Sequence, residues 1–228
     1  MLRVDGQTNR IGGLVAVNDV SFTVAKGSVV AIVGPNGAGI RVTGYAPHRL
    51  AAIGMGRTFQ NIRLFRHLNA LENVMIGRTA RTRSGVFDAL AWTSRDREER
   101  RATVEQAEAL LDWVGVGDNR FRMPAELPYG DQRRVEIARA LALDPKLLIL
   151  DEPTAGMVAQ EARGVIDLIA RLKQAGMTLM LIEHNMNVVM AASDRIVVIN
   201  FGEKIAEGTP AEIRADRKVI EAYLGAEE

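Results

Sequence analysis

The sequence predicts an α/β fold in which a buried parallel sheet carries functional residues at one edge. Three apolar segments support this, at Val29–Val33, Leu147–Leu150 and Met177–Ile182. None alternates polar and apolar residues, which is typical of strands covered on both faces. Each is followed at once by a glycine or by acidic residues, at the end of the strand where open α/β sheets bind ligands. We therefore expect a ligand site at that edge.

Length and composition allow one globular unit, or a core with a small subdomain. The 228 residues are 47% hydrophobic and 25% charged, enough to bury a sizeable core. A formal net charge of +1 argues against nucleic acid as a partner. The sequence has no cysteine, and its histidines, at positions 48, 67 and 184, are not spaced as metal ligands. No apolar run approaches the roughly 18 residues that span a bilayer, so we expect any work at a membrane to depend on partners.

A glycine-rich turn follows the first two predicted strands. Residues 15–24 predict one strand and Val29–Val33 the next. The turn matches the first half of the phosphate-binding pattern G-x-x-x-x-G-K-[ST], whose backbone N–H groups surround phosphate. Alone, half a motif is equally typical of a tight turn. Its residues are Gly34, Pro35, Asn36, Gly37, Ala38 and Gly39.

The segment after Gly39 departs from that pattern. Ile40 and Arg41 stand where the lysine and the hydroxyl residue are expected. A parallel strand also needs a crossover of a dozen or more residues, normally a helix, yet only Pro47–Ile53 could form a short one. We infer that a block of roughly 20 residues, the usual size of a crossover, is missing between Gly39 and Val42.

The middle of the chain predicts a helical subdomain at about residues 66–144. Asn69–Gly77 predicts a short helix, Arg78–Ser94 a loop or a small amphipathic face, and Arg95–Val114 a long charged helix with one apolar stripe. The charge run indicates a solvated face. A further helix starts near Gly130, whose N–H groups could bind an anion, and stops before Asp144-Pro145. Its predicted inward residues are Val135, Ile137, Ala138, Leu141 and Leu143.

Two acidic residues end the central strand, Asp151 and Glu152. In a nucleotide-hydrolysing site the first holds Mg²⁺ and the second deprotonates the attacking water. An acidic turn that caps a helix is the alternative. Gln60, in RTFQNIRLF, could ligate Mg²⁺ through water, or be a plain surface amide. His184 follows a core strand directly, which favours a functional role, although an isolated histidine is more often structural.

The carboxyl-terminal part predicts an antiparallel portion and a closing helix. Residues 195–200 and 203–206 predict a hairpin around Phe201-Gly202. Thr209, Pro210 and Glu212 form the pattern of a capping box with proline at the first helical position.

Taken together, these segments resemble the ATP-binding subunits of ABC transporters. The phosphate loop, Gln60, LPYGDQRRVEIARAL, LLILDEPTAG and Glu183-His184 follow the order of Walker A, Q-loop, signature, Walker B and H-loop. Four phrases look like those of the ATP-binding subunits of importers for branched-chain and other hydrophobic amino acids: RTFQNIRLF, IEHNMNVVM, INFGEKIAEGTP and VIEAYLG. The resemblance covers essentially the whole chain and implies a P-loop NTPase core.

The resemblance also implies roles and partners. Residues Gly34–Gly39 would bind ATP, and Tyr129, Gly130 and Gln132 would cap the γ-phosphate on a second ABC subunit, identical or different. Asp151 and Gln60 would hold Mg²⁺, while Glu152, His184 and Gln60 would support hydrolysis. The expected partners are membrane permease subunits and, indirectly, a substrate-binding protein, at the cytoplasmic face of the plasma membrane.

We interpret the chain as one ABC ATPase domain, residues 1–228, that drives an importer. Two alternatives remain open on the sequence. A catalytically silent subunit would fit the incomplete phosphate loop, although the intact Glu152 and His184 argue against it. A soluble ABC protein outside transport would normally carry two cassettes in one chain.

Overall fold

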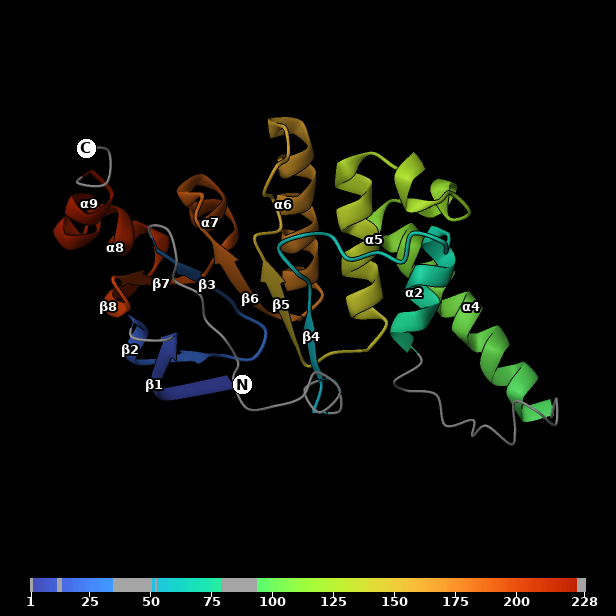
Figure 1. Ribbon diagram of the computed structural model, residues 1–228, viewed down its shortest axis with the longest axis horizontal. Coiled ribbons are helices and arrows are strands. Elements are labelled where there is room, and N and C mark those ends of the chain that lie inside the picture. Colours follow the sequence, from blue (N-terminus) through green and yellow to red (C-terminus); the bar gives the residue numbers. More distant parts are fainter. Residues whose placement is uncertain (1, 12–13, 35–50, 52, 79–93, 225–228) are drawn as a thin grey trace. The chain divides into compact units, whose positions relative to one another are not determined.

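The computed structural model describes residues 2–11, 14–34, 51, 53–78 and 94–224 (Figure 1). The chain forms two compact units. The sheet unit comprises residues 1–45, 147–155 and 166–228. The helical unit comprises residues 46–146 and 156–165.

Parallel strands form the centre of the sheet unit. They are β3 (Val29–Val33), β5 (Leu147–Asp151), β6 (Thr178–Glu183) and β7 (Arg195–Asn200). β6 pairs in parallel with both β5 and β3, and β3 pairs in parallel with β7. All of β3 is buried, as its uninterrupted apolar sequence predicts. The parallel sheet expected from the sequence is confirmed.

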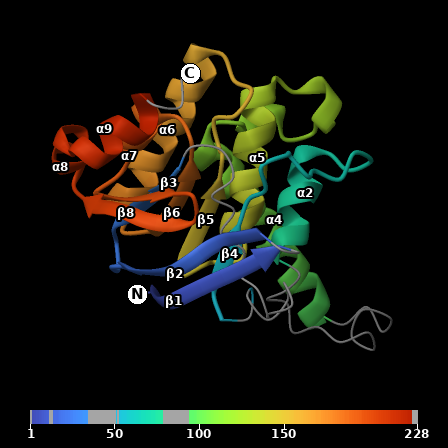
Figure 2. The ribbon, with the colours of Figure 1, turned by 60° about the vertical axis from the view of Figure 1, so that its left-hand side comes forward.

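Antiparallel strands complete the sheet unit. β8 (Glu203–Gly208) pairs antiparallel with β7, so the order of strands is β5-β6-β3-β7-β8. Phe201 and Gly202 turn the chain between them with φ angles of 47° and 82°, as the predicted hairpin requires. β1 (Leu2–Ile11) and β2 (Leu14–Val24) form a separate antiparallel pair, and β2 contacts β6 and β8 (Figure 2).

Short helices pack on these strands. α7 (Met186–Ala192) contacts β3 and β6, and its first turn is capped by Asn185, which accepts from the N–H of Asn187. α8 (Pro210–Ala215) begins with the predicted capping box of Thr209 and Glu212. α9 (Arg217–Leu224) contacts α8 and β8. α6 (Ala159–Gln174) contributes its first residues, to Val165, to the helical unit.

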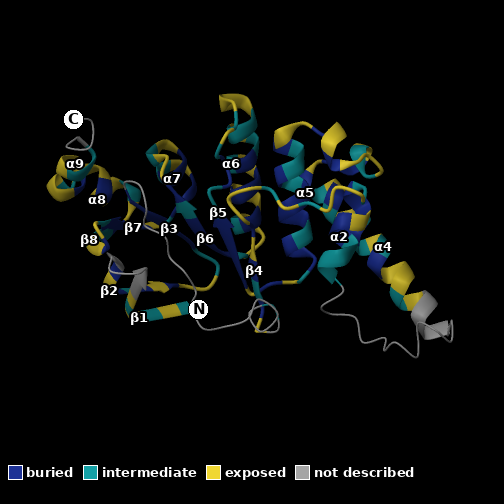
Figure 3. Ribbon diagram, viewed as in Figure 1, coloured by how far each residue is buried: buried dark blue, intermediate teal, exposed yellow. Residues whose placement is uncertain are grey.

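Among the described residues of the helical unit, α2 (Ala70–Arg78), α4 (Ser94–Val114) and α5 (Tyr129–Leu141) contact one another. The short strand β4 (Met55–Arg57) contacts α5, and the turns η2 (Gly117–Asn119) and η3 (Pro124–Glu126) lie between α4 and α5. Figure 3 shows buried residues along one side of α4 and exposed residues along the other. The solvated charged face predicted for this helix is confirmed where the structure describes its side chains.

The prediction is wrong for one of the residues expected to face inward from α5. Val135, Ile137, Ala138 and Leu141 are buried, but Leu143 is only half-buried. The helix ends at Leu141, so the 3.6-residue repeat no longer applies at Leu143. The predicted loop at residues 79–93, most of Pro47–Ile53 and the turn Pro35–Gly39 lie outside the described residues.

Of the helices in the described ranges, none combines the length and the apolar character that crossing a bilayer requires.

Candidate functional site

Predicted site residues of the sheet unit meet at one edge of the sheet. β3, β6 and β5 are neighbours in parallel, with Val33 opposite Glu183 and Ile182 opposite Asp151. The residues at the ends of these strands, or directly after them, therefore emerge side by side. They are Gly34, which is buried, then Asp151 with Glu152, and finally His184.

The backbone of Glu152 is held in an unusual conformation. Its φ angle is 43°, in the left-handed region that costs a residue with a Cβ about 1–2 kcal/mol. Its N–H donates to the carbonyl of Ile182 at 2.8 Å, and its carbonyl accepts from the N–H of Ala155 at 3.1 Å. Such strain persists only where neighbouring contacts enforce it, and it is concentrated at functional sites.

The side chains of Glu152 and His184 face each other across this edge. Nδ1 of His184 lies 3.7 Å from Oε2 of Glu152, with the histidine side chain 59% exposed and the carboxylate 24% exposed. Both groups are thus open to a ligand, and both can reach the same water or phosphate oxygen.

Glu183 fixes the loops from which these two side chains extend. Glu183 is 3% exposed. One of its carboxylate oxygens accepts hydrogen bonds from the Thr154 hydroxyl at 2.6 Å and from the Thr154 backbone N–H at 3.2 Å. The other oxygen accepts from the N–H groups of His184 and Asn185 at 3.2 and 3.4 Å. The sequence alone predicts no separate role for Glu183. Its position between a core strand and a candidate histidine was the available signal.

Asp151 fits a magnesium site shared with phosphate. It is half-buried at the same edge. Within the described ranges, no group of three or more histidine, cysteine or acidic side chains could hold a metal ion. Mg²⁺ commonly takes only one or two protein carboxylates and completes its coordination with water and substrate phosphates, so a single aspartate at this edge is compatible with such a site.

The start of α5 lies in the helical unit and already binds an anionic group. The N–H of Gly130 donates to Oε1 of Glu161 at 3.3 Å, while Oε2 of Glu161 accepts from Val158 at 3.3 Å. A Cβ on Gly130 would lie 3.3 Å from the Cβ of Glu161, tighter than most real contacts. The N–H expected to bind phosphate is therefore bonded to a carboxylate here.

The other two signature residues differ in exposure. Tyr129 is 37% exposed, and its ring lies about 3.9 Å from the position that a Cβ on Gly156 would take. Gln132 is half-buried and donates through Nε2 to the carbonyl of Leu127 at 3.0 Å. Part of the Tyr129 side chain is thus exposed to solvent, whereas the side-chain amide of Gln132 stabilises the turn before α5.

Gln60 also lies in the helical unit, with an exposed side chain. Its carbonyl accepts a bond of 2.8 Å from Nη2 of Arg133, a buried residue of α5. Arg133 forms a buried ion pair with Glu136 at 2.7 Å. Burial raises the pKa of Glu136, and the charge of Arg133 opposes that rise. Sequence reasoning missed this pair, because charged residues on a helix are normally solvated.

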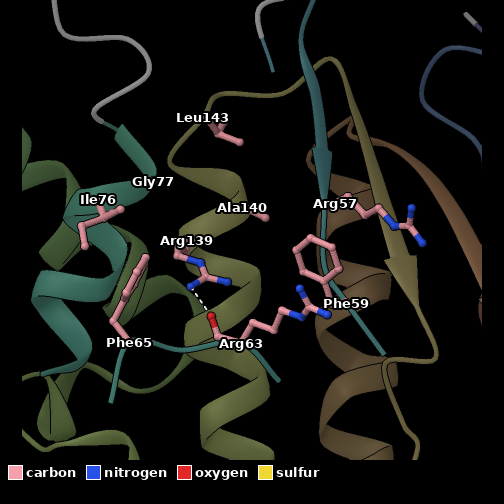
Figure 4. Close-up of a pocket in the computed structure, with 9 residues that line it drawn as sticks. All are labelled: Arg57, Phe59, Arg63, Phe65, Ile76, Gly77, Arg139, Ala140 and Leu143. Carbon is pink, nitrogen blue, oxygen red and sulfur yellow. Dashed lines mark hydrogen bonds between the residues drawn. The ribbon is translucent and has the colours of Figure 1, made fainter. Parts of the chain in front are cut away.

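A pocket of about 380 Å³ lies beside residues 59–63 in the helical unit (Figure 4). Exposed rings of Phe59 and Phe65 line it together with Arg57, Arg63 and Arg139. The Arg63 guanidinium lies 4.9 Å from the centroid of Phe59, and that of Arg139 lies 5.8 Å from the centroid of Phe65. This surface combines apolar and cationic character.

Comparison with known proteins identifies the family. A family model described as "ABC transporter" matches residues 43–155, and one described as "Branched-chain amino acid ATP-binding cassette transporter" matches residues 203–228. The chain is 39% identical to the high-affinity branched-chain amino acid transport ATP-binding protein LivG of Salmonella typhimurium, over 99% of this chain and 98% of the relative. BraF of Pseudomonas aeruginosa, named as the same kind of protein, gives the same identity and coverage. The chain belongs to the ABC transporter family.

Solved structures of ABC cassettes have the same fold. The ATP-binding cassette MJ1267 gives a TM-score of 0.81 at 29% identity, covering 97% of each chain. Its ADP conformation gives a TM-score of 0.80 at 28% identity, covering 98% of each chain. The predicted P-loop NTPase core with an antiparallel portion is thereby confirmed.

The ABC relatives also bear on the segment after Gly39. The alignment to LivG spans 249 positions, whereas this chain has 228 residues, so at least 21 aligned positions have no counterpart here. That difference agrees in size with the missing block inferred from the sequence, without locating it.

Proposed function

We propose that this chain is the ATP-binding and ATP-hydrolysing subunit of an importer for branched-chain amino acids. The observation that carries the proposal is the 3.7 Å approach of His184 to Glu152 at the sheet edge that begins with Gly34. Full-length similarity to ABC transport proteins supports a working ATPase rather than a catalytically silent subunit.

In the proposed reaction, the loop that starts at Gly34 and continues through Gly39 holds the phosphates of ATP. Glu152 accepts a proton from the attacking water, and His184 holds that water and the γ-phosphate in position. Asp151 and Gln60 would hold Mg²⁺, which when bound would neutralise charge on the phosphates. The strained backbone of Glu152 supports this assignment, because it sets the direction of the carboxylate before substrate arrives.

The second half of the proposed site comes from another cassette, identical to this chain or different. Tyr129, Gly130 and Gln132 at the start of α5 would approach the γ-phosphate bound by the partner. The N–H of Gly130 suits this role because it already binds a carboxylate. ATP binding would close such a pair of subunits, and hydrolysis would reopen it.

We further propose that the pocket beside Gln60 receives a segment of a membrane permease. Its exposed phenylalanines give apolar contact area, and its arginines complement a polar or acidic segment. The subunit would then lie peripherally at the cytoplasmic face of the plasma membrane, and a substrate-binding protein would act indirectly through the permease. The helical subdomain, about residues 66–144, would carry part of this docking surface, and Phe59, Arg63 and Phe65 just before it would supply the rest.

The substrate class rests on the relatives. LivG and BraF are named for branched-chain amino acid transport, and the family model for such transporters matches residues 203–228. Nothing in the sheet unit or the helical unit contacts the transported molecule in this proposal, because the permease carries it.

Replacing Glu152 by Gln tests the proposal. The amide keeps the size and hydrogen-bonding reach of the carboxylate but cannot take the proton, so ATP turnover of the assembled transporter should fall by roughly 10²-fold or more. ATP binding should persist, and the variant should accumulate as an ATP-bound dimer. Unchanged steady-state turnover would refute the assignment of Glu152.

A further inference from the structure

Arg133 binds the backbone around Gln60 from helix α5. Its Nη1 donates to the carbonyl of Phe59 at 2.6 Å, and its Nη2 donates to the carbonyl of Gln60 at 2.8 Å. The two terminal nitrogens of the guanidinium therefore donate hydrogen bonds to two consecutive backbone carbonyls. These bonds join residues 74 and 73 positions apart in the sequence.

Two more α5 side chains hold the same segment. Glu136 accepts from the N–H of Arg63 at 3.3 Å, and Arg139 donates to the carbonyl of Arg63 at 2.5 Å (Figure 4). We call residues 59–63 the Gln60 segment, and Arg133, Glu136 and Arg139 the α5 clamp. The clamp residues are spaced three apart, so they share one face of the helix.

Burial makes this arrangement specific. The side chains of Arg133 and Glu136 are 0% and 1% exposed and lie 2.7 Å apart. A buried ion pair adds little stability beyond what apolar residues of the same volume give, because both charges lose their water. Charge-assisted bonds to backbone carbonyls, in contrast, fix direction and distance strongly. The pair is thus better explained by the geometry it imposes on the Gln60 segment than by stability.

The clamp holds Gln60 by its backbone and leaves its side chain exposed. The same helix begins at Tyr129-Gly130, the signature residues of the helical unit. A helix is stiff over a single turn, so the Gln60 segment and the start of α5 belong to one rigid group within this unit.

We propose that Arg133 and Glu136 are positioning residues that hold Gln60 in a fixed place relative to Gly130. When Gly130 binds phosphate and the start of α5 moves, the contacts of Arg133 and Glu136 transmit that movement to Gln60. This inference rests on the roles of Gln60 and Gly130 in the proposed function. Neither Arg133 nor Glu136 is required to contact ATP.

The test uses Arg133→Met with Glu136→Met, which removes both members of the buried ion pair together. Arg139 stays in place with its bond to the carbonyl of Arg63, and this double variant is called the clamp-free variant. Arg134→Met is the matched control, because Arg134 is the next residue of α5 and its guanidinium lies beside Gly115 and Gly164 instead. Arg133→Lys is a second variant. Lysine keeps a positive charge near Glu136 but lacks the planar guanidinium, whose two terminal nitrogens donate to the carbonyls of Phe59 and Gln60.

Hydrogen exchange measures positioning directly. The amides of residues 60–64 should exchange at least about tenfold faster in the clamp-free variant and not in the control. Arg133→Lys should give a smaller increase. Equal exchange in a folded clamp-free variant, or in Arg133→Lys if the former does not fold, would overturn the inference.

Kinetics of the assembled transporter then separates this role from general stability. The clamp-free variant should lose about tenfold in kcat with ATP affinity within about twofold, and adding Gln60→Ala should cause no further loss. Losses that multiply would overturn the inference and leave the role of Gln60 intact. A normal kcat for Gln60→Ala alone would instead refute the proposed role of Gln60, and the inference with it.

Discussion

Oε1 of Glu161 accepts a hydrogen bond from the backbone N–H of Gly130, with 3.3 Å between the two heavy atoms. A carboxylate thus occupies the amide that the proposed function assigns to the partner's γ-phosphate. Phosphate can reach that amide only if the carboxylate gives way, because two anions repel each other at this distance. Under the proposed function, Glu161 would therefore compete with formation of the closed dimer.

Replacing Glu161 by Gln should favour the ATP-bound dimer. The amide keeps the shape of the side chain and can still accept from Val158, while the negative charge beside Gly130 is removed. We expect half-maximal dimer formation at roughly 3- to 10-fold lower ATP, in the range of about 0.5–1.5 kcal/mol that one ordinary hydrogen bond provides. Size-exclusion chromatography of a Glu152→Gln background over a series of ATP concentrations measures this.

Glu105→Gln is the control for that experiment. Glu105 is an exposed carboxylate of α4 that pairs with Arg101, and its loss removes the same charge elsewhere on the helical unit. An equal shift in the control would show a net-charge effect. A weaker dimer in Glu161→Gln, at an unchanged melting temperature, would contradict the competition.

His184 and Glu152 should act as a unit in hydrolysis. Because their side chains lie 3.7 Å apart and can share one water, removing either should abolish the arrangement. We expect His184→Ala to lower kcat by about 10- to 100-fold, with little change in ATP affinity. His67→Ala, an exposed histidine outside both halves of the site, should leave turnover unchanged.

The double variant His184→Ala with Glu152→Gln supplies the decisive comparison. Groups that act together show non-additive losses, so it should be no slower than Glu152→Gln alone. Losses that multiply would mean that the two side chains contribute independently.

Sequence reasoning located the edge residues of the sheet unit because parallel pairing leaves few alternatives. Once Leu147–Leu150 and Met177–Ile182 are taken as buried parallel strands, Asp151, Glu152 and His184 must emerge at one edge. The α5 clamp could not be predicted in this way. Burial of Arg133 depends on carbonyls more than 70 positions away, and no local repeat reveals such a partner.

The intact mass of the natural polypeptide tests the missing block. We expect the mass to exceed 24.9 kDa by the mass of roughly 20 residues, the usual size of a crossover unit. The polypeptide should then contain Lys followed by Ser or Thr after Gly39. The 249 aligned positions of LivG support this. A mass of 24.9 kDa would show that the chain truly lacks the lysine that contacts the β- and γ-phosphates, and turnover should then be weak.

Phe65 should report docking to the permease. The sequence indicates a docking surface at Asn61–Phe65 with part of Leu68–Val74, and Leu64 and Phe65 as its apolar residues. In the structure Leu71 and Val74 are buried and Leu64 does not line the pocket, whereas Phe65 does and is 51% exposed. Its backbone is anchored to Asn73, which accepts from its N–H at 2.8 Å and donates to its carbonyl at 3.1 Å. The ring is therefore a fixed, exposed contact.

Replacing Phe65 by Ser should release the subunit from membranes and uncouple transport. ATP affinity and melting temperature should stay close to those of the parent, because a half-exposed ring on an anchored backbone contributes little to the core. Phe121→Ser is the matched control, since that ring is 70% exposed and does not line the pocket. Membrane co-purification, ATP affinity and melting temperature are measured on the same preparations. If Phe65→Ser loses stability and ATP binding together, the ring belongs to the core of the helical unit and the docking surface must lie elsewhere. If it keeps all three properties, the permease does not use this ring.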